Sequence, residues 1–110
     1  MVAPLTTTEL AELLASQRVD VVDVRDQDEW EAGHIAGARL VPLDQFRADP
    51  DAAIEHGSII VFVCTKGVRS LTAAKLAERF GYENVFTLEG GMKEWGWAGL
   101  PTVAAERVAA

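Results

Sequence analysis

An uninterrupted apolar run, Ile59–Val63, limits the fold of this chain more than any other feature of its sequence. A strand with one face in water alternates apolar and polar residues. A parallel strand covered on both faces is apolar throughout. Because such a strand needs a helix layer on each side, the run predicts an α/β fold with a mainly parallel central sheet flanked by helices on both faces.

The rest of the chain alternates between strand-like and helix-like segments, as an α/β fold requires. Strands are expected at residues 19–24, 39–41, 58–63 and 85–88. Helices are expected after capping-box patterns at 6–9 and 26–29, as about one turn within 43–48, at 70–80 before Gly81, and after Gly90-Gly91. A chain of 110 residues fits one domain, so residues 1–110 are predicted to form a single domain.

Composition and charge narrow the classes of partner. The formal net charge of −7 argues against a broad surface for nucleic acid or an anionic membrane. Residues 57–77 nevertheless contain no Asp or Glu and carry Lys66, Arg69 and Lys75, which suggests a local anion site. One cysteine cannot form an intramolecular disulfide, which fits a reducing compartment. No targeting pattern is visible and no apolar run could span a bilayer, so a cytoplasmic location is expected.

The segment after the apolar run contains the candidate functional residues, a cysteine and an anion-binding loop. Cys64 stands at the carboxyl end of a predicted strand, where ligands bind in open α/β sheets. The following helix directs its free amides at that loop and stabilises a thiolate. Gly67 allows successive amides to turn inward, and Lys66 and Arg69 add charge. Ser70 is a predicted N-cap whose hydroxyl can also face the pocket. From its position alone, Cys64 could instead be a buried small hydrophobic residue.

The same residues carry a resemblance to a known family. The loop from Cys64 to Ser70 resembles the active-site loop of the rhodanese family, Cys-x-x-Gly-x-Arg-Ser. Three more segments resemble that family in order and spacing: Asp23-Val24-Arg25 with Glu29, Gly33-His34-Ile35-x-Gly37-Ala38, and Gly90-Gly91-x-x-x-Trp95. The resemblance covers about Val19 to Pro101, and the rhodanese-like region is predicted at about 16–103.

The resemblance implies a sulfurtransferase of the thiosulfate sulfurtransferase type that needs no cofactor. Cys64 would attack the outer sulfur of thiosulfate or another persulfide donor, sulfite would leave, and a thiol or cyanide would accept sulfur from the Cys64 persulfide. The donor is expected to be a small anion, and a sulfur-relay protein is a further candidate partner. The residues expected to bind substrate are Thr65, Lys66, Gly67, Val68, Arg69, Ser70 and Arg25.

Other residues of these segments are expected to support the site. Asp23, Glu29 and His34 are predicted to be structural, and Arg25 either braces the sheet edge with Asp23 or lines the pocket. Two histidines and one cysteine without ligand-like spacing argue against a metal site. The three tryptophans are interpreted as core and rim packing, and Gly90-Gly91 as a tight turn.

Three other functions compete with sulfur transfer. A rhodanese-like domain can act as a non-catalytic interaction module, and the intact loop with Cys64 argues against this. A redox-sensing role would oxidise Cys64 to a sulfenic acid and, without a second cysteine in the chain, would need an external thiol. Related cysteine phosphatases use Cys-x5-Arg, whereas Arg69 follows Cys64 as Cys-x4-Arg, so the loop is expected to suit sulfur better than phosphate.

Overall fold

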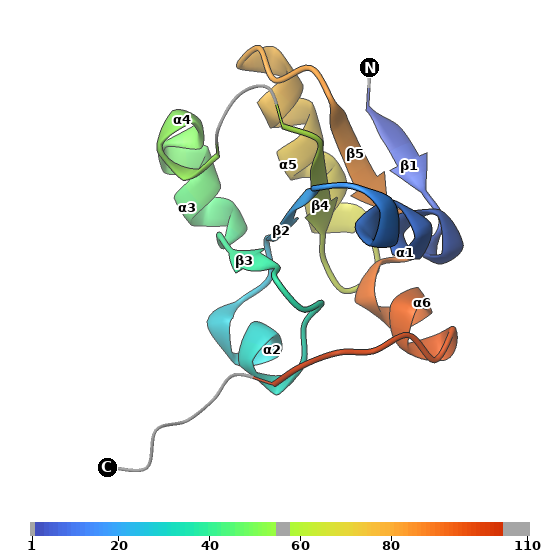
Figure 1. The fold of residues 1–110 in the computed structure, drawn as a ribbon. Helices are drawn as coiled ribbons and strands as arrows, with labels where there is room; N and C mark the ends of the chain where they lie inside the picture. Colours follow the sequence, from blue (N-terminus) through green and yellow to red (C-terminus); the bar gives the residue numbers. More distant parts are fainter. Residues whose placement is uncertain (1, 55–57, 105–110) are drawn as a thin grey trace.

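Five parallel strands form one sheet at the centre of the computed structural model, which describes residues 2–54 and 58–104 (Figure 1). The strands are β1 (Ala3–Leu5), β2 (Asp20–Asp23), β3 (Arg39–Leu40), β4 (Ile60–Val63) and β5 (Val85–Leu88). Their order is β1-β5-β4-β2-β3, and every pair is parallel. All four residues of the central strand β4 are buried. The predicted fold class is therefore confirmed. The run is apolar throughout because the strand is buried on both faces, as expected.

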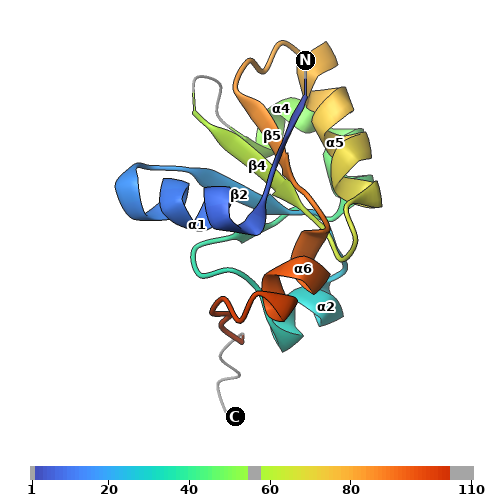
Figure 2. The same cartoon turned by 90° about the vertical axis from the view of Figure 1, so that its right-hand side faces the viewer.

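Helices cover both faces of the sheet, as Figures 1 and 2 show. They are α1 (Thr7–Ser16), α2 (Gln27–Ala32), α3 (Leu43–Ala48), α4 (Pro50–Ala53), α5 (Val68–Arg79) and α6 (Gly91–Trp97). Ile60 and Phe62 of β4 pack in one core with residues of α3 and α5. Val61 and Val63 pack in the other with Leu10 of α1 and with α6. Successive residues of β4 thus point into two separate cores, one on each face of the sheet. Because both cores are apolar, every residue of the strand is apolar. None of the helices in the described ranges is long and apolar enough to cross a membrane.

Local sequence signals explain where the first two helices begin. The hydroxyl of Thr6 accepts a hydrogen bond from the Glu9 amide at 3.1 Å, and Glu9 accepts one from the Thr6 amide at 3.0 Å. This is the predicted capping box, and α1 starts directly after it. At the second predicted box, the Asp26 amide donates to Glu29 Oε1 at 3.2 Å. Both pairs satisfy backbone groups that the first helical turn leaves without partners.

The structure differs from the sequence predictions at three elements. Strand β1 was not expected: it is short, and Pro4 fits only an edge strand because proline has no amide hydrogen to donate. Helix α4 was not expected either. Helix α5 starts at Val68 rather than at Ser70, and Gly67 is its N-cap, so the prediction of Ser70 as N-cap is wrong. At its other end, Gly81 has the left-handed backbone that was expected there.

Parallel pairing brings the functional segments to one edge of the sheet. Cys64 directly follows β4, Val24 and Arg25 follow β2, and Gly90 lies just after β5. Since β2, β4 and β5 are neighbours and run the same way, their carboxyl ends meet at this edge, as seen below the sheet in Figure 1. Helix α2 lies there as well. The edge is therefore where the sheet can bring together segments far apart in the sequence.

Candidate active site

The sulfur of Cys64 is surrounded by hydrogen-bonding groups although its residue is only 1% exposed. It accepts hydrogen bonds from the amides of Gly67 at 3.1 Å and Ser70 at 3.3 Å. The thiol can also donate to the Ser70 hydroxyl, 3.3 Å away, and the hydroxyl could donate in turn to a thiolate. A structural cysteine needs none of these contacts. Donors converging on one sulfur are an arrangement that stabilises negative charge there.

Gly67 makes this arrangement sterically feasible. Its φ of 103° lies in the left-handed region, which other residues enter only at a cost. That conformation ends the loop, begins α5, and turns the Gly67 amide toward the sulfur. Ser70 then falls in the first turn of α5, fully buried, with both its amide and its hydroxyl at the sulfur. Gly67 and Ser70 therefore contact the sulfur itself.

The start of α6 holds the cysteine loop in place. The amides of Met92 and Lys93 donate to the carbonyl oxygens of Cys64 at 2.8 Å and Thr65 at 3.0 Å. Gly91 has a positive φ of 61°, and a Cβ atom placed there would lie 2.3 Å from the Cys64 carbonyl oxygen. Only glycine permits this approach. Because these amides bind the loop carbonyls, the Gly90-Gly91 segment is a turn that fixes the loop, as the sequence suggested.

Glu29 of α2 is the centre of a polar network on the same loop. Its carboxylate oxygens accept bonds from the Arg69 guanidinium at 2.9 and 3.1 Å and from the Thr65 hydroxyl at 2.7 Å. Arg69 Nη2 also donates to Thr65 Oγ1 at 3.1 Å. Hydrogen bonding from Arg69, supported by Thr65, lowers the pKa of Glu29 to about 2. The same pair raises the pKa of Arg69 above its ordinary value. The charge of Arg69 is thus already paired.

A pocket of about 310 Å³ opens beside the sulfur. It is lined by Glu29, Cys64, Thr65, Lys66, Val68 and Arg69. The structure therefore gathers the predicted loop residues at one site, and it adds Glu29, which the sequence marked only as structural support. The contact of Glu29 with the loop could not be predicted from the spacing of residues in the sequence, because Glu29 lies 40 residues before Arg69, on another helix.

Arg25 lies outside this pocket lining, which does not support its prediction as a substrate-binding residue. Its guanidinium donates to Asp23 Oδ1 at 2.9 Å and Oδ2 at 2.7 Å, and to the Gly33 carbonyl oxygen at 2.7 Å. Arg25 is 6% exposed and Asp23 is fully buried. A paired and buried guanidinium cannot reach a ligand without breaking these bonds. The alternative expectation, that the pair braces the sheet edge, agrees with this geometry.

His34 also has contacts of a structural kind. Its Nδ1 lies 2.7 Å from the Trp30 carbonyl oxygen, and its ring stacks on the Trp30 ring at 3.8 Å.

Trp95 is 2% exposed and donates its indole hydrogen to the carbonyl oxygen of Pro101, whereas Trp97 is 82% exposed. Packing therefore accounts for Trp30 and Trp95 but not for Trp97. Among the described residues, no three His, Cys, Asp or Glu side chains are grouped to hold a metal ion.

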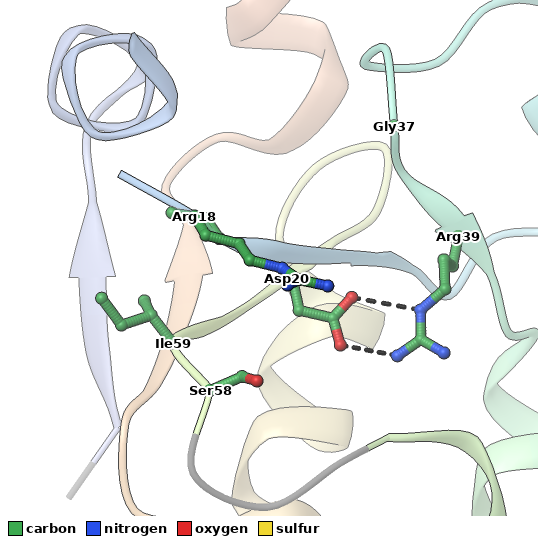
Figure 3. A pocket seen from close by; sticks show the side chains of 7 residues that line it. Arg18, Asp20, Gly37, Arg39, Ser58 and Ile59 are labelled. Atoms are coloured by element: carbon green, nitrogen blue, oxygen red, sulfur yellow. Dashed lines mark hydrogen bonds and ion pairs between the residues drawn. The ribbon is translucent and has the colours of Figure 1, made fainter. Parts of the chain in front are cut away.

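A larger cavity of about 670 Å³ lies at the opposite edge of the sheet (Figure 3). Its wall includes Asp20 and Arg39, at the amino ends of β2 and β3, which form an ion pair with bonds of 3.1 and 2.6 Å. These two charges therefore offset each other. The cavity lies at the edge away from the thiol, so the smaller pocket beside Cys64 is the candidate active site.

Comparison with known sequences identifies proteins similar to this chain. A family model described as the rhodanese-like domain matches residues 6–97. The uncharacterized protein YqhL of Bacillus subtilis is 35% identical over 80 residues, which cover 73% of this chain and 63% of YqhL. A tRNA uridine(34) hydroxylase of Erwinia tasmaniensis is 34% identical, covering 84% of this chain and 28% of that protein. The probable adenylyltransferase/sulfurtransferase MoeZ of Mycobacterium tuberculosis is 33% identical, covering 83% and 24%. The chain spans less than two thirds of each of these relatives.

Solved structures share the fold. A rhodanese-like domain protein from Staphylococcus aureus superposes with a TM-score of 0.82 at 34% identity, over 94% of this chain and 99% of that one. A thiosulfate sulfurtransferase from Pseudomonas aeruginosa superposes with a TM-score of 0.81 at 26% identity, over 96% of this chain and 20% of that one.

Proposed function

The chain belongs to the rhodanese-like domain family, and we propose that it is a sulfurtransferase that carries sulfane sulfur as a persulfide on Cys64. The observation that carries the proposal is the convergence of two amides and one hydroxyl on the Cys64 sulfur. Sulfurtransferases among the similar proteins support the class of reaction. The substrate and the acceptor are proposals based on the chemistry of the pocket.

The reaction divides into two displacements at sulfur. The Cys64 thiolate attacks the outer sulfur of an anionic donor such as thiosulfate, a new S–S bond forms, and the bond to the sulfonyl sulfur breaks. Sulfite leaves with the electron pair of that bond. A thiol or cyanide then attacks the outer sulfur of the persulfide and restores the Cys64 thiolate. Because thiolate and persulfide are both anions, the Gly67 and Ser70 amides can stabilise the resting enzyme and the intermediate alike.

Two features favour this reaction over the competing functions. A non-catalytic module would need neither the pocket nor the donors around the sulfur, and both are present. A redox sensor would need an external thiol to reduce an oxidised Cys64, because the chain contains no second cysteine. We also propose a cytoplasmic location, since a reducing compartment keeps a single thiol free. A sulfur-relay protein that delivers a persulfide is an alternative donor.

The direct test of the function is a donor comparison. Thiosulfate, mercaptopyruvate and a persulfidated protein are supplied in turn, with cyanide as acceptor, and thiocyanate formation is followed. Turnover with thiosulfate above the uncatalysed rate is the expected result. Turnover with the persulfidated protein alone would assign a relay function, and no turnover with any donor would contradict the proposal.

Lys66 is expected to assist binding of the anionic donor. Its side chain is exposed, lines the pocket, and makes no ion pair with any residue in the described part of the chain. Replacing Lys66 by alanine should raise the KM for thiosulfate about fivefold and change kcat less, because one exposed charge contact is worth about 1 kcal/mol. Lys75→Ala is the matched control, since it removes the same charge from an exposed position of α5 outside the pocket lining. Equal KM values for both variants would contradict a role for Lys66 in donor binding.

A further inference from the structure

The charges that line the pocket are more balanced than the sequence suggested. Arg69 and Glu29 form a two-bond ion pair, with side chains 35% and 34% exposed. Lys66 is the lining cation without such a partner among the described residues. When Cys64 is a thiolate, the lining therefore carries two positive and two negative charges. A donor entering this pocket meets no excess of positive charge.

We propose that Glu29 is a specificity-determining residue: by holding Arg69 in an ion pair, it removes the preference for doubly charged thiosulfate that an unpaired Arg69 would give the pocket, so that a singly charged sulfane-sulfur donor can compete. This inference rests on the proposed function and names the class of donor for that site. A thiosulfonate, in which one oxygen of thiosulfate is replaced by a carbon group, is such a singly charged donor.

The geometry explains why Arg69 is not free to bind the donor. Its Nη1 donates to Glu29 Oε1, and its Nη2 donates to both Glu29 Oε2 and Thr65 Oγ1. Thr65 in turn donates to Glu29, so the three side chains hold one another. With its pKa lowered to about 2, Glu29 remains ionised at neutral pH. An anion that displaced Glu29 from Arg69 would have to break this closed set of bonds.

The number of charges on the donor then decides how strongly Glu29 opposes it. Coulomb energy is proportional to the product of the charges, so a dianion is repelled by the Glu29 carboxylate twice as strongly as a monoanion at the same distance. Attraction to Lys66 scales in the same way, but the Cys64 thiolate repels the donor as well. The net charge of the lining therefore controls the preference between donors of different charge.

Two donors of nearly equal size isolate this effect. Thiosulfate and the methanethiosulfonate anion differ by an oxygen anion in place of a methyl group. With either donor, the Cys64 thiolate forms a bond to the outer sulfur, the bond to the sulfonyl sulfur breaks, and its electron pair leaves on sulfite or on methanesulfinate. The charges balance in both reactions, and neither requires an oxidant or a reductant. The two donors differ in intrinsic reactivity. This difference cancels when the ratio of the two rates in a variant is compared with the same ratio in the wild type.

The experiment measures kcat/KM for both donors in four variants and in the wild type. Glu29→Gln keeps the side-chain shape and leaves the lining one charge more positive. The ratio of kcat/KM for thiosulfate to kcat/KM for methanethiosulfonate should therefore rise about fivefold. Arg69→Gln should lower the ratio by a similar factor, and the double variant should return it near the wild-type value. Asp28→Asn is the control: it removes a carboxylate from an exposed position next to Glu29 that does not line the pocket, and its ratio should not change.

The possible failures are distinguishable. If Glu29 only supports the loop, its replacement will slow both donors together, leave the ratio unchanged, and overturn the inference. If Glu29→Gln does not fold, as judged by circular dichroism, the inference is decided by the fall of the ratio in Arg69→Gln and its recovery in the double variant. If neither donor is turned over above the level of Cys64→Ser, the proposed function itself fails.

Discussion

Replacing Cys64 by serine is expected to reduce sulfur transfer by at least about a hundredfold while the protein remains folded. The chain contains no second thiol that could take over, and a serine hydroxyl is a poor nucleophile toward sulfur without a base. Serine is close to cysteine in size and can keep contacts with the Gly67 and Ser70 amides, so the free energy of unfolding should change by about 1 kcal/mol or less.

The measurement is steady-state thiocyanate formation, with thermal unfolding followed on the same samples. Ser70→Ala is the matched comparison because it keeps the thiol and both amides and removes one hydroxyl contact. Its loss of activity should be far smaller, on the order of fivefold, as for a single hydrogen bond. Turnover of Cys64→Ser above a few per cent of wild type would place the nucleophile elsewhere.

Replacing Gly91 by alanine is expected to have the largest effect on stability. The added Cβ would lie 2.3 Å from the Cys64 carbonyl oxygen and 2.6 Å from that of Thr65, and these are backbone atoms held by the loop. The positive φ of 61° adds strain of its own. We expect a loss of about 3 kcal/mol or more in the free energy of unfolding, together with loss of sulfur transfer, because the loop must move.

Gly99→Ala separates the steric contact from the backbone strain. Gly99 has a similar φ of 72°, but no atom beyond Gly99 and its two chain neighbours lies within 4 Å of the position that a Cβ would take there. It should lose only about 1–2 kcal/mol and keep its activity. In thermal unfolding, the Tm of Gly91→Ala should lie about 10 °C or more below that of Gly99→Ala. Similar Tm values and equal activity would contradict the conclusion that the start of α6 fixes the loop.

The order of elements was predictable because the strongest signals are local. An apolar run such as Ile59–Val63 reports burial on both faces, and the capping pattern at Thr6 and Glu9 reports a helix start, so both were found. Strand β1 was missed because three residues are too few to show an alternation of apolar and polar side chains. It becomes a strand only by pairing with β5. The start of α5 was misplaced because Gly67 takes a backbone conformation that its sequence neighbours do not reveal.

The residues of the candidate site could be proposed from the sequence, but the ion pair and hydrogen bonds between their side chains could not. The loop from Cys64 to Ser70 is contiguous, so its chemistry can be read directly. The partner of Arg69 comes from α2, and only the fold places Glu29 against it. Arg25 was expected either to brace the sheet edge with Asp23 or to line the pocket, and its bond to the Gly33 carbonyl oxygen depends on where the chain returns after α2. Lys66 and Arg69 were both expected to add free positive charge to the loop, and the fold pairs Arg69 with Glu29.

The mass of the intact chain after exposure to thiosulfate tests the central proposal most directly. The proposal predicts that the mass rises by one sulfur atom, that fragmentation assigns the addition to Cys64, and that cyanide removes it with release of thiocyanate. Cys64→Ser should show no addition. An added oxygen atom in place of sulfur, or an unchanged mass under conditions in which the protein is folded, would contradict a Cys64 persulfide.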